Sequence, residues 1–173
     1  MLRIPQQAPI QSSVLGTNSP TVPPVQEVVP DRIIIPAIGI DTAIQQVGLT
    51  EDGAMEVPSN NTDVGWFKFG PPPGQIGSAV ITGHYDGENG ATGIFEKLHT
   101  LQKGDKIYIK DTEGQVTNFT VRETRKYNPD ADASEVFNQT ESSHLNLITC
   151  DGSWETAQNS YSKRLVVFTD AIL

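Results

Sequence analysis

The chain has 173 residues, of which 12 are Lys or Arg and 21 are Asp or Glu, so its formal net charge is −9. Neutralising phosphate groups requires an excess of basic residues, and this composition therefore argues against a nucleic-acid-binding face and against binding to anionic lipid. Its single cysteine, Cys150, excludes an intrachain disulfide and a multi-cysteine zinc site. The length fits one domain with a core of its own.

Residues 1–30 differ in composition from the rest of the chain. They hold six of the 12 prolines and carry only Arg3 and Glu27 as charged residues, and every aromatic residue comes later. Such a segment buries too little apolar surface to offset the entropy lost on ordering, so we predict a flexible, Pro-rich linker or arm. The alternative is an extended strap across the surface of the domain formed by residues 31–173.

From Asp31 onward the chain consists of short β-type runs separated by Gly, Pro, Asn and Asp. The predicted strands are Ile33–Ile35, Ile38–Ile40, Ser78–Thr82, Lys106–Lys110, Val116–Arg122, Leu145–Thr149 and Leu165–Phe168. Helical signal is limited to Gly93–Leu98 and to a capping box of Asp132 and Glu135 that would open a short turn. Many short strands with little helix predict an all-β fold, either a sandwich or, as we favour, a closed β-barrel.

Cys150 directly follows the predicted strand Leu145–Thr149. Free cysteines are usually buried and inert, so a core position is the alternative to a nucleophile. A nucleophilic cysteine needs a nearby base or cation that favours the thiolate, and histidine is the usual supplier. The next question is therefore which histidine and which cation the fold could bring to this thiol.

His84 is the best-placed histidine because it also stands at a strand exit, after Ser78–Thr82. His144 lies six residues before Cys150 on an extended run, or about 20 Å away at roughly 3.3 Å per residue. We expect His99 and His144 to be polar surface residues.

Arg164 precedes Leu165–Phe168, and strand alternation places it on the face of Val166 and Phe168. An arginine on an apolar face either extends its charge to solvent or points into a site. A permanent cation beside a thiolate could stabilise an oxyanion during acyl transfer. Cys150, His84 and Arg164 therefore form a candidate acyl-transfer site.

Three segments resemble the catalytic motifs of the sortase family. Asn146–Cys150 is similar to the signature Thr-Leu-x-Thr-Cys, Ala79–His84 to the histidine segment, and Tyr161–Phe168 to the arginine strand. Further similar stretches occur in family order: Arg32–Asp41, Val47–Leu49, Asp52–Met55, Val64–Trp66, Gly70–Gly74 and Gly93–Leu98. The resemblance covers roughly residues 31–172. Asn146 departs from the signature threonine, and the residues after Cys150 look most like class F, ahead of class E or D.

The resemblance implies an eight-stranded β-barrel and a cysteine transpeptidase. Such an enzyme cleaves a Leu-Pro-x-Thr-Gly sorting signal between Thr and Gly, holds the acyl group as a thioester, and transfers it to an amine. Cys150 would be the nucleophile, and His84 the general acid that protonates the leaving amine. Arg164 would position the carbonyl and stabilise the oxyanion, and Thr149 would be a further substrate contact.

The resemblance also implies partners and a location. The amine would belong to a cell-wall precursor or to a pilin lysine, and the protein would anchor surface proteins at the outer face of a bacterial membrane. Sortases carry an N-terminal membrane helix that this sequence lacks, so we expect that tether to have been removed, Met1 to be an added start, and this form to be a soluble monomer. We expect no cofactor: some class A sortases bind calcium, but Asp130, Asp132 and Glu135 read as solvated charges and a helix cap.

Three alternatives to a sortase can be considered, and the sequence argues against the first of them. An L,D-transpeptidase would carry a Ser-His-Gly-Cys motif, which the sequence lacks. A cysteine hydrolase would release the thioester to water without transfer to an amine. A non-catalytic β-barrel module that binds cell-wall components would tolerate the substitution Cys150→Ala.

Overall fold

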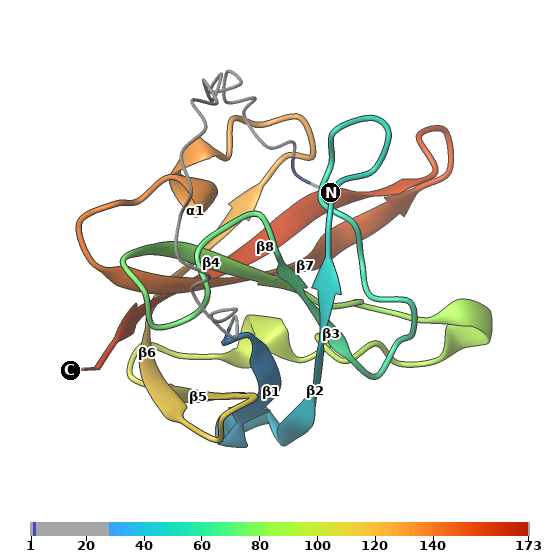
Figure 1. Ribbon diagram of the computed structural model, residues 1–173. Coiled ribbons are helices and arrows are strands. Elements are labelled where there is room, and N and C mark those ends of the chain that lie inside the picture. Colours follow the sequence, from blue (N-terminus) through green and yellow to red (C-terminus); the bar gives the residue numbers. More distant parts are fainter. Residues whose placement is uncertain (1, 3–27, 173) are drawn as a thin grey trace, which may run out of the picture.

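The computed structural model describes residue 2 and residues 28–172, which form a closed β-barrel (Figure 1). The strands are β1 Pro30–Ile35, β2 Ile40–Val47, β3 Val64–Phe67, β4 Gly77–Thr82, β5 Lys106–Asp111, β6 Val116–Tyr127, β7 Ser143–Glu155 and β8 Ser160–Ala171. Helical structure among the described residues is limited to α1 Ser134–Phe137 and the 3-10 turns η1 Pro36–Ile38, η2 Glu88–Gly90 and η3 Leu98–Thr100. The predicted all-β, eight-stranded closed barrel is confirmed.

Most of the predicted linker lies outside the described residues. The exceptions are Leu2 and the stretch that leads into β1, whose first residue is Pro30. The predicted boundaries of the linker and of the domain stay predictions. The predicted helical turn at Gly93–Leu98 is instead a series of turns that leads into η3.

The order of strands around the barrel is β1-β2-β3-β4-β7-β8-β6-β5, and β5 pairs with β1 to close it. β4 and β7 are parallel, with Thr82 opposite Ile148. Because parallel strands leave a sheet at the same end, the residues after Thr82 and those after Ile148 emerge together. β8 is antiparallel to β7 and returns from that same end.

The barrel interior follows the two-residue alternation of the strands. Leu145 and Leu147 of β7, with Leu165 and Val167 of β8, point inward into the main core, and Phe95 and Leu98 pack there from the connecting segments.

A second apolar cluster lies on the opposite face of β4, β7 and β8, and we call it the outer apolar cluster. It consists of Leu2, Val47, Met55, Phe67, Val80, Ala133, Val136, Ile148, Val166 and Phe168. Val136 belongs to α1, so this short helix covers the outer face of the sheet. Asn146 fixes the helix there, because its Nδ2 donates a hydrogen bond of 2.6 Å to the carbonyl of Val136. The residue that departs from the signature threonine thus has a structural role.

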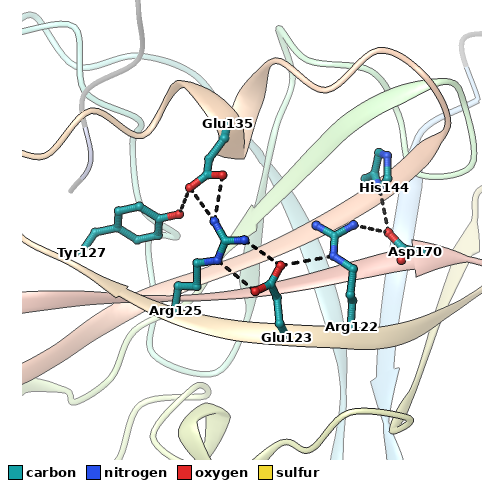
Figure 2. A network of polar contacts seen from close by, with 7 residues as sticks. All are labelled: Arg122, Glu123, Arg125, Tyr127, Glu135, His144 and Asp170. Atoms are coloured by element: carbon teal, nitrogen blue, oxygen red, sulfur yellow. Dashed lines mark hydrogen bonds and ion pairs between the residues drawn. The ribbon is translucent and has the colours of Figure 1, made fainter.

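Polar contacts hold the other side of α1 to β6 (Figure 2). Arg125 donates to both carboxylate oxygens of Glu135 at 2.9 Å and to Glu123, and Tyr127 donates to Glu135. The hydrogen bond from Tyr127 is the main cause that lowers the pKa of Glu135. Burial, followed by the bond to Glu135, raises the pKa of Tyr127 to about 12. In the predicted capping box, Asp132 accepts a hydrogen bond of 2.9 Å from the Ser134 amide. Within residues 28–172, Glu135 makes no capping bond, because its carboxylate is bound by Arg125.

Candidate active site

Cys150 lies on β7 directly opposite Arg164 on β8. Residues in such antiparallel register share a face of the sheet, with β-carbons about 4.5–5.5 Å apart. This is the outer face, because Ile148 and Val166 form the preceding pair and belong to the outer apolar cluster. The sequence prediction that Arg164 shares a face with Val166 is therefore confirmed.

The thiol lies at the rim of the barrel. β4 is paired with β7 only as far as Thr82 and Ile148, whereas β7 and β8 continue as a two-stranded ribbon whose turn projects past the barrel (Figure 1). β7 therefore extends beyond the predicted Leu145–Thr149 as far as Glu155. The half-buried Cys150 lies just beyond the point where the neighbouring strand β4 stops pairing with β7.

His84 is brought to the same rim by the strand pairing. The amide of Gly83 donates to the carbonyl of Ile148 at 3.2 Å, so β4 and β7 stay joined up to the residue before the histidine. Gly83 is required there, because a β-carbon would lie 2.6 Å from Cδ2 of the buried Phe95 ring. The sequence-predicted residues Cys150, His84 and Arg164 thus come to one end of the barrel.

The imidazole of His84 contacts the carbonyl oxygen of Pro58, 2.9 Å from Nε2. A carbonyl only accepts hydrogen bonds, so Nε2 must carry the proton in this arrangement, and Nδ1 remains as the nitrogen that can gain or release one.

Arg164 is held as a fixed cation and is only 4% exposed. One terminal nitrogen, Nη1, donates to the carbonyls of Tyr161 and Lys163, and Nη2 donates to the hydroxyl of Ser160, all at 2.9 Å. Among the described residues its buried Nε–H has no hydrogen-bond partner. Buried donors are nearly always paired, so this unpaired one, on the residue directly opposite Cys150, is a candidate contact for a substrate oxygen.

Thr149 faces the opposite way from Cys150 and is 3% exposed. Its hydroxyl donates to the carbonyl of Gly83 at 2.9 Å, so its contact here is with the residue that precedes His84. The predicted contact of Thr149 with substrate stays a prediction.

His144 is not the surface residue that the sequence suggested; that expectation is wrong. Its side chain is buried between the hydroxyl of Ser142 and a carboxylate oxygen of Asp170, each 2.8 Å away. Asp170 also accepts from Arg122 at 2.7 Å, which completes the network in Figure 2. His99 is exposed, as expected, and its Nδ1 lies 3.0 Å from the carbonyl of Glu96.

Sequence reasoning missed a group of side chains around the site. The ring of Tyr161 packs edge-on against Tyr85 and Trp154, with centroid distances of 5.5 and 5.2 Å, and its hydroxyl donates to the carboxylate of Asp86. This bond, together with burial and with the negative charge of Asp86, raises the pKa of Tyr161 to about 12. Asp86 and Tyr161 lie 75 positions apart, so no local pattern could have paired them.

No group of three or more His, Cys, Asp or Glu side chains is arranged to hold a metal ion within the described part of the chain. Of the acidic residues considered above, Glu135 is bound by Arg125 and Tyr127, and Asp132 by a backbone amide. The absence of a cofactor stays a prediction. Within residues 28–172, no helix has the length and apolar character needed to span a bilayer.

Taken together, the candidate site holds a thiol, an imidazole and a buried guanidinium at one end of the barrel. These are the groups that acyl transfer through a thioester requires.

Comparison with solved structures supports this fold. Sortase C2 of Group B Streptococcus pilus island 1 is 24% identical with a TM-score of 0.62, over 86% of this chain and 76% of that one. Sortase A from Corynebacterium diphtheriae is 24% identical with a TM-score of 0.65, over 84% and 61%. A Clostridium perfringens sortase D5 transpeptidase is 21% identical with a TM-score of 0.62, over 84% and 79%. No curated relative matches significantly.

A comparison of the sequence with models of protein families shows to which family the chain belongs. The sortase domain matches residues 33–172, which is most of the chain and includes all three candidate catalytic residues. The class suggested by the sequence, class F, stays a prediction. With the barrel and the Cys150–Arg164 pairing, the match shows that the chain belongs to the sortase family of cysteine transpeptidases.

Proposed function

We propose that this sortase cleaves a Leu-Pro-x-Thr-Gly sorting signal between Thr and Gly and transfers the acyl group to an amine. The observation that carries the proposal is the register of β7 and β8, which sets Cys150 opposite Arg164. The parallel pairing of β4 with β7 adds His84 at the same rim.

Each of the three residues has a role in the first half-reaction. The Cys150 thiolate attacks the carbonyl carbon of the substrate threonine, forming the carbon–sulfur bond, and Arg164 stabilises the negative charge that develops on the oxygen. The carbon–nitrogen bond then breaks, and His84 gives its proton to the departing glycine amine, leaving a thioester on Cys150.

The second half-reaction reverses these roles. An incoming amine attacks the thioester carbonyl and gives up a proton to His84, while Cys150 leaves as the thiolate. Nδ1 of His84 is suited to this exchange because Nε2 is already engaged with Pro58. Water in place of the amine would make the enzyme a hydrolase.

The outer apolar cluster supports the choice of a leucine-containing signal. It lies on the face of the sheet that carries Cys150, and Leu2 is fully buried within it. We expect the leucine of the sorting signal to bind in this cluster, in the place that Leu2 takes here. Burying a leucine side chain contributes about 1.5–3 kcal/mol, enough to anchor a short peptide in register with the thiol.

The partners follow from the same reaction. The acyl donor is the sorting signal of a surface protein, and the acceptor is an amine of a cell-wall precursor or a pilin lysine. We place the protein at the outer face of a bacterial membrane, acting as a monomer.

The test is incubation of the protein with a Leu-Pro-x-Thr-Gly peptide and a small amine, followed by mass analysis of the peptide products. The proposal predicts cleavage at Thr–Gly with the amine joined to threonine, abolished in Cys150→Ala. Cleavage with water alone would support the hydrolase. No cleavage of any peptide in a varied panel would favour the non-catalytic binding module.

A further inference from the structure

The loop that carries His84 is joined to the ribbon that carries Cys150 by a side-chain hydrogen bond. Asp86, two residues after the histidine, accepts from the hydroxyl of Tyr161 on β8. Within the described residues, the backbone hydrogen bonds between the β4 and β7 segments end with the bond from the Gly83 amide to the Ile148 carbonyl, three residues before Asp86. The Asp86–Tyr161 bond therefore joins the His84 loop to β8 beyond the last of these backbone hydrogen bonds.

We propose that Asp86 and Tyr161 are positioning residues that hold His84 in place against Cys150 and Arg164. We call this pair the Asp86–Tyr161 clasp. The proposal rests on the proposed function and adds to it two residues that do not themselves react.

Tyr161 is attached to the catalytic cation as well as to the histidine loop. Its backbone carbonyl accepts the 2.9 Å hydrogen bond from Nη1 of Arg164. One residue thus contacts the guanidinium through its main chain and the His84 loop through its side chain. A shift of the ribbon would move both catalytic groups, and the clasp opposes that shift.

The direction of the Tyr161 hydroxyl is fixed by its neighbours. Its ring is held edge-on by Tyr85 at an interplanar angle of 70° and by Trp154 at 76°. Tyr85 is adjacent to His84, so this packing joins the same two elements as the hydrogen bond. The raised pKa of Tyr161 keeps its hydroxyl protonated, and hence a donor, throughout the neutral range.

Asp86 is itself held by a small turn. It forms an isolated β-bridge with Thr92, and the amide of Gly87 donates to the carbonyl of Ala91 at 2.6 Å. On the other side of Asp86, the carbonyls of Tyr85 and His84 accept from the amides of Gly93 and Phe95 at 3.2 and 2.9 Å, so Asp86 and His84 belong to one short segment closed by backbone hydrogen bonds.

The experiment is a double-mutant cycle on peptide cleavage with Tyr161→Phe, Asp86→Ala and the combination of both, since alanine leaves no side-chain acceptor for the Tyr161 hydroxyl. Each single change should lower kcat about tenfold and leave KM within about twofold, since the clasp aligns the reacting groups rather than binding the peptide. The double variant should lose about the same tenfold, because all three variants lack one and the same hydrogen bond. Tyr108→Phe, a tyrosine change on β5 far from the site, serves as the matched control.

Either of two results overturns the clasp: losses that multiply to about a hundredfold in the double variant, or a kcat that is unchanged in both single variants. Thermal unfolding of each variant accompanies the kinetics. Tyr161→Phe retains the packed ring and Asp86 lies on the surface, so we expect all the variants to fold.

A substrate-free measurement separates this proposal from the proposed function. The rate of Cys150 alkylation by iodoacetamide at pH 7 reports the thiolate that a positioned His84 favours. It should fall about fivefold in both single variants and stay unchanged in Tyr108→Phe. If the wild-type protein cleaves no peptide, the proposed function fails, whereas the alkylation rates still support or overturn the clasp.

Discussion

Replacing Arg164 by lysine should greatly reduce catalysis even though it keeps the positive charge. The guanidinium makes three hydrogen bonds of 2.9 Å that fix its plane, and its Nε–H remains without a partner among the described residues. A lysine ammonium is a point charge on a flexible stem and cannot present that planar set of donors.

The size of the effect follows from the donor that is lost. Removing one positioned donor to an oxyanion lowers kcat by about 10²–10³, or about 2.7–4 kcal/mol of transition-state stabilisation. Because Arg164 is only 4% exposed, solvent cannot replace the missing donor, and we expect the full range to apply.

The assay is steady-state cleavage of the sorting-signal peptide, with kcat and KM measured separately. Arg32→Lys is the matched control, because Arg32 on β1 is exposed and pairs with Asp41 away from the site. A kcat of Arg164→Lys within threefold of wild type would refute the reasoning and remove Arg164 from oxyanion stabilisation.

Three further predictions concern the surroundings of the site. Gly83→Ala should lower the free energy of unfolding in urea by about 1–3 kcal/mol, because its β-carbon would lie 2.6 Å from the ring of Phe95; a change below about 0.5 kcal/mol would contradict this. Leu2→Asp should lower KM for the peptide, because a charged side chain cannot stay in the outer apolar cluster; an unchanged KM would show that Leu2 does not compete there. The pKa of Glu135 is lowered from its ordinary value of 4.5, so the ionised carboxylate stabilises the fold at pH values above 4.5, and this stabilisation is lost as the pH falls through the lowered pKa. The free energy of unfolding of Glu135→Gln should therefore depend less on pH in the acid range than that of the wild type. An equal dependence in the two proteins would refute this.

The sequence was sufficient where local pattern determines structure. Strand alternation correctly placed Arg164 on the same face of β8 as Val166. The motifs singled out Cys150, His84 and Arg164, each of which stands next to a short apolar run, and the fold brings all three to one end; their catalytic roles stay predictions.

What the sequence did not reveal depends on contacts between distant segments. His144 looks like a polar surface residue in isolation, and its burial follows from Asp170 in the neighbouring strand. Likewise, Glu135 has the spacing of a capping residue, but the stronger charged partner Arg125 takes it instead. Asp86 and Tyr161 are brought together only by the pairing of strands far apart in the sequence, so neither residue carries a local signal of its role.

The central claim, a thioester on Cys150, is tested most directly by the intact mass of the protein after incubation with a Leu-Pro-x-Thr-Gly peptide in the absence of an acceptor amine. The account predicts an added mass equal to the peptide segment that ends at threonine, located on Cys150 after digestion, removed by a small amine, and absent from Cys150→Ala. Cleavage of the peptide without this adduct under acid quench, or an adduct on a residue other than Cys150, would contradict it.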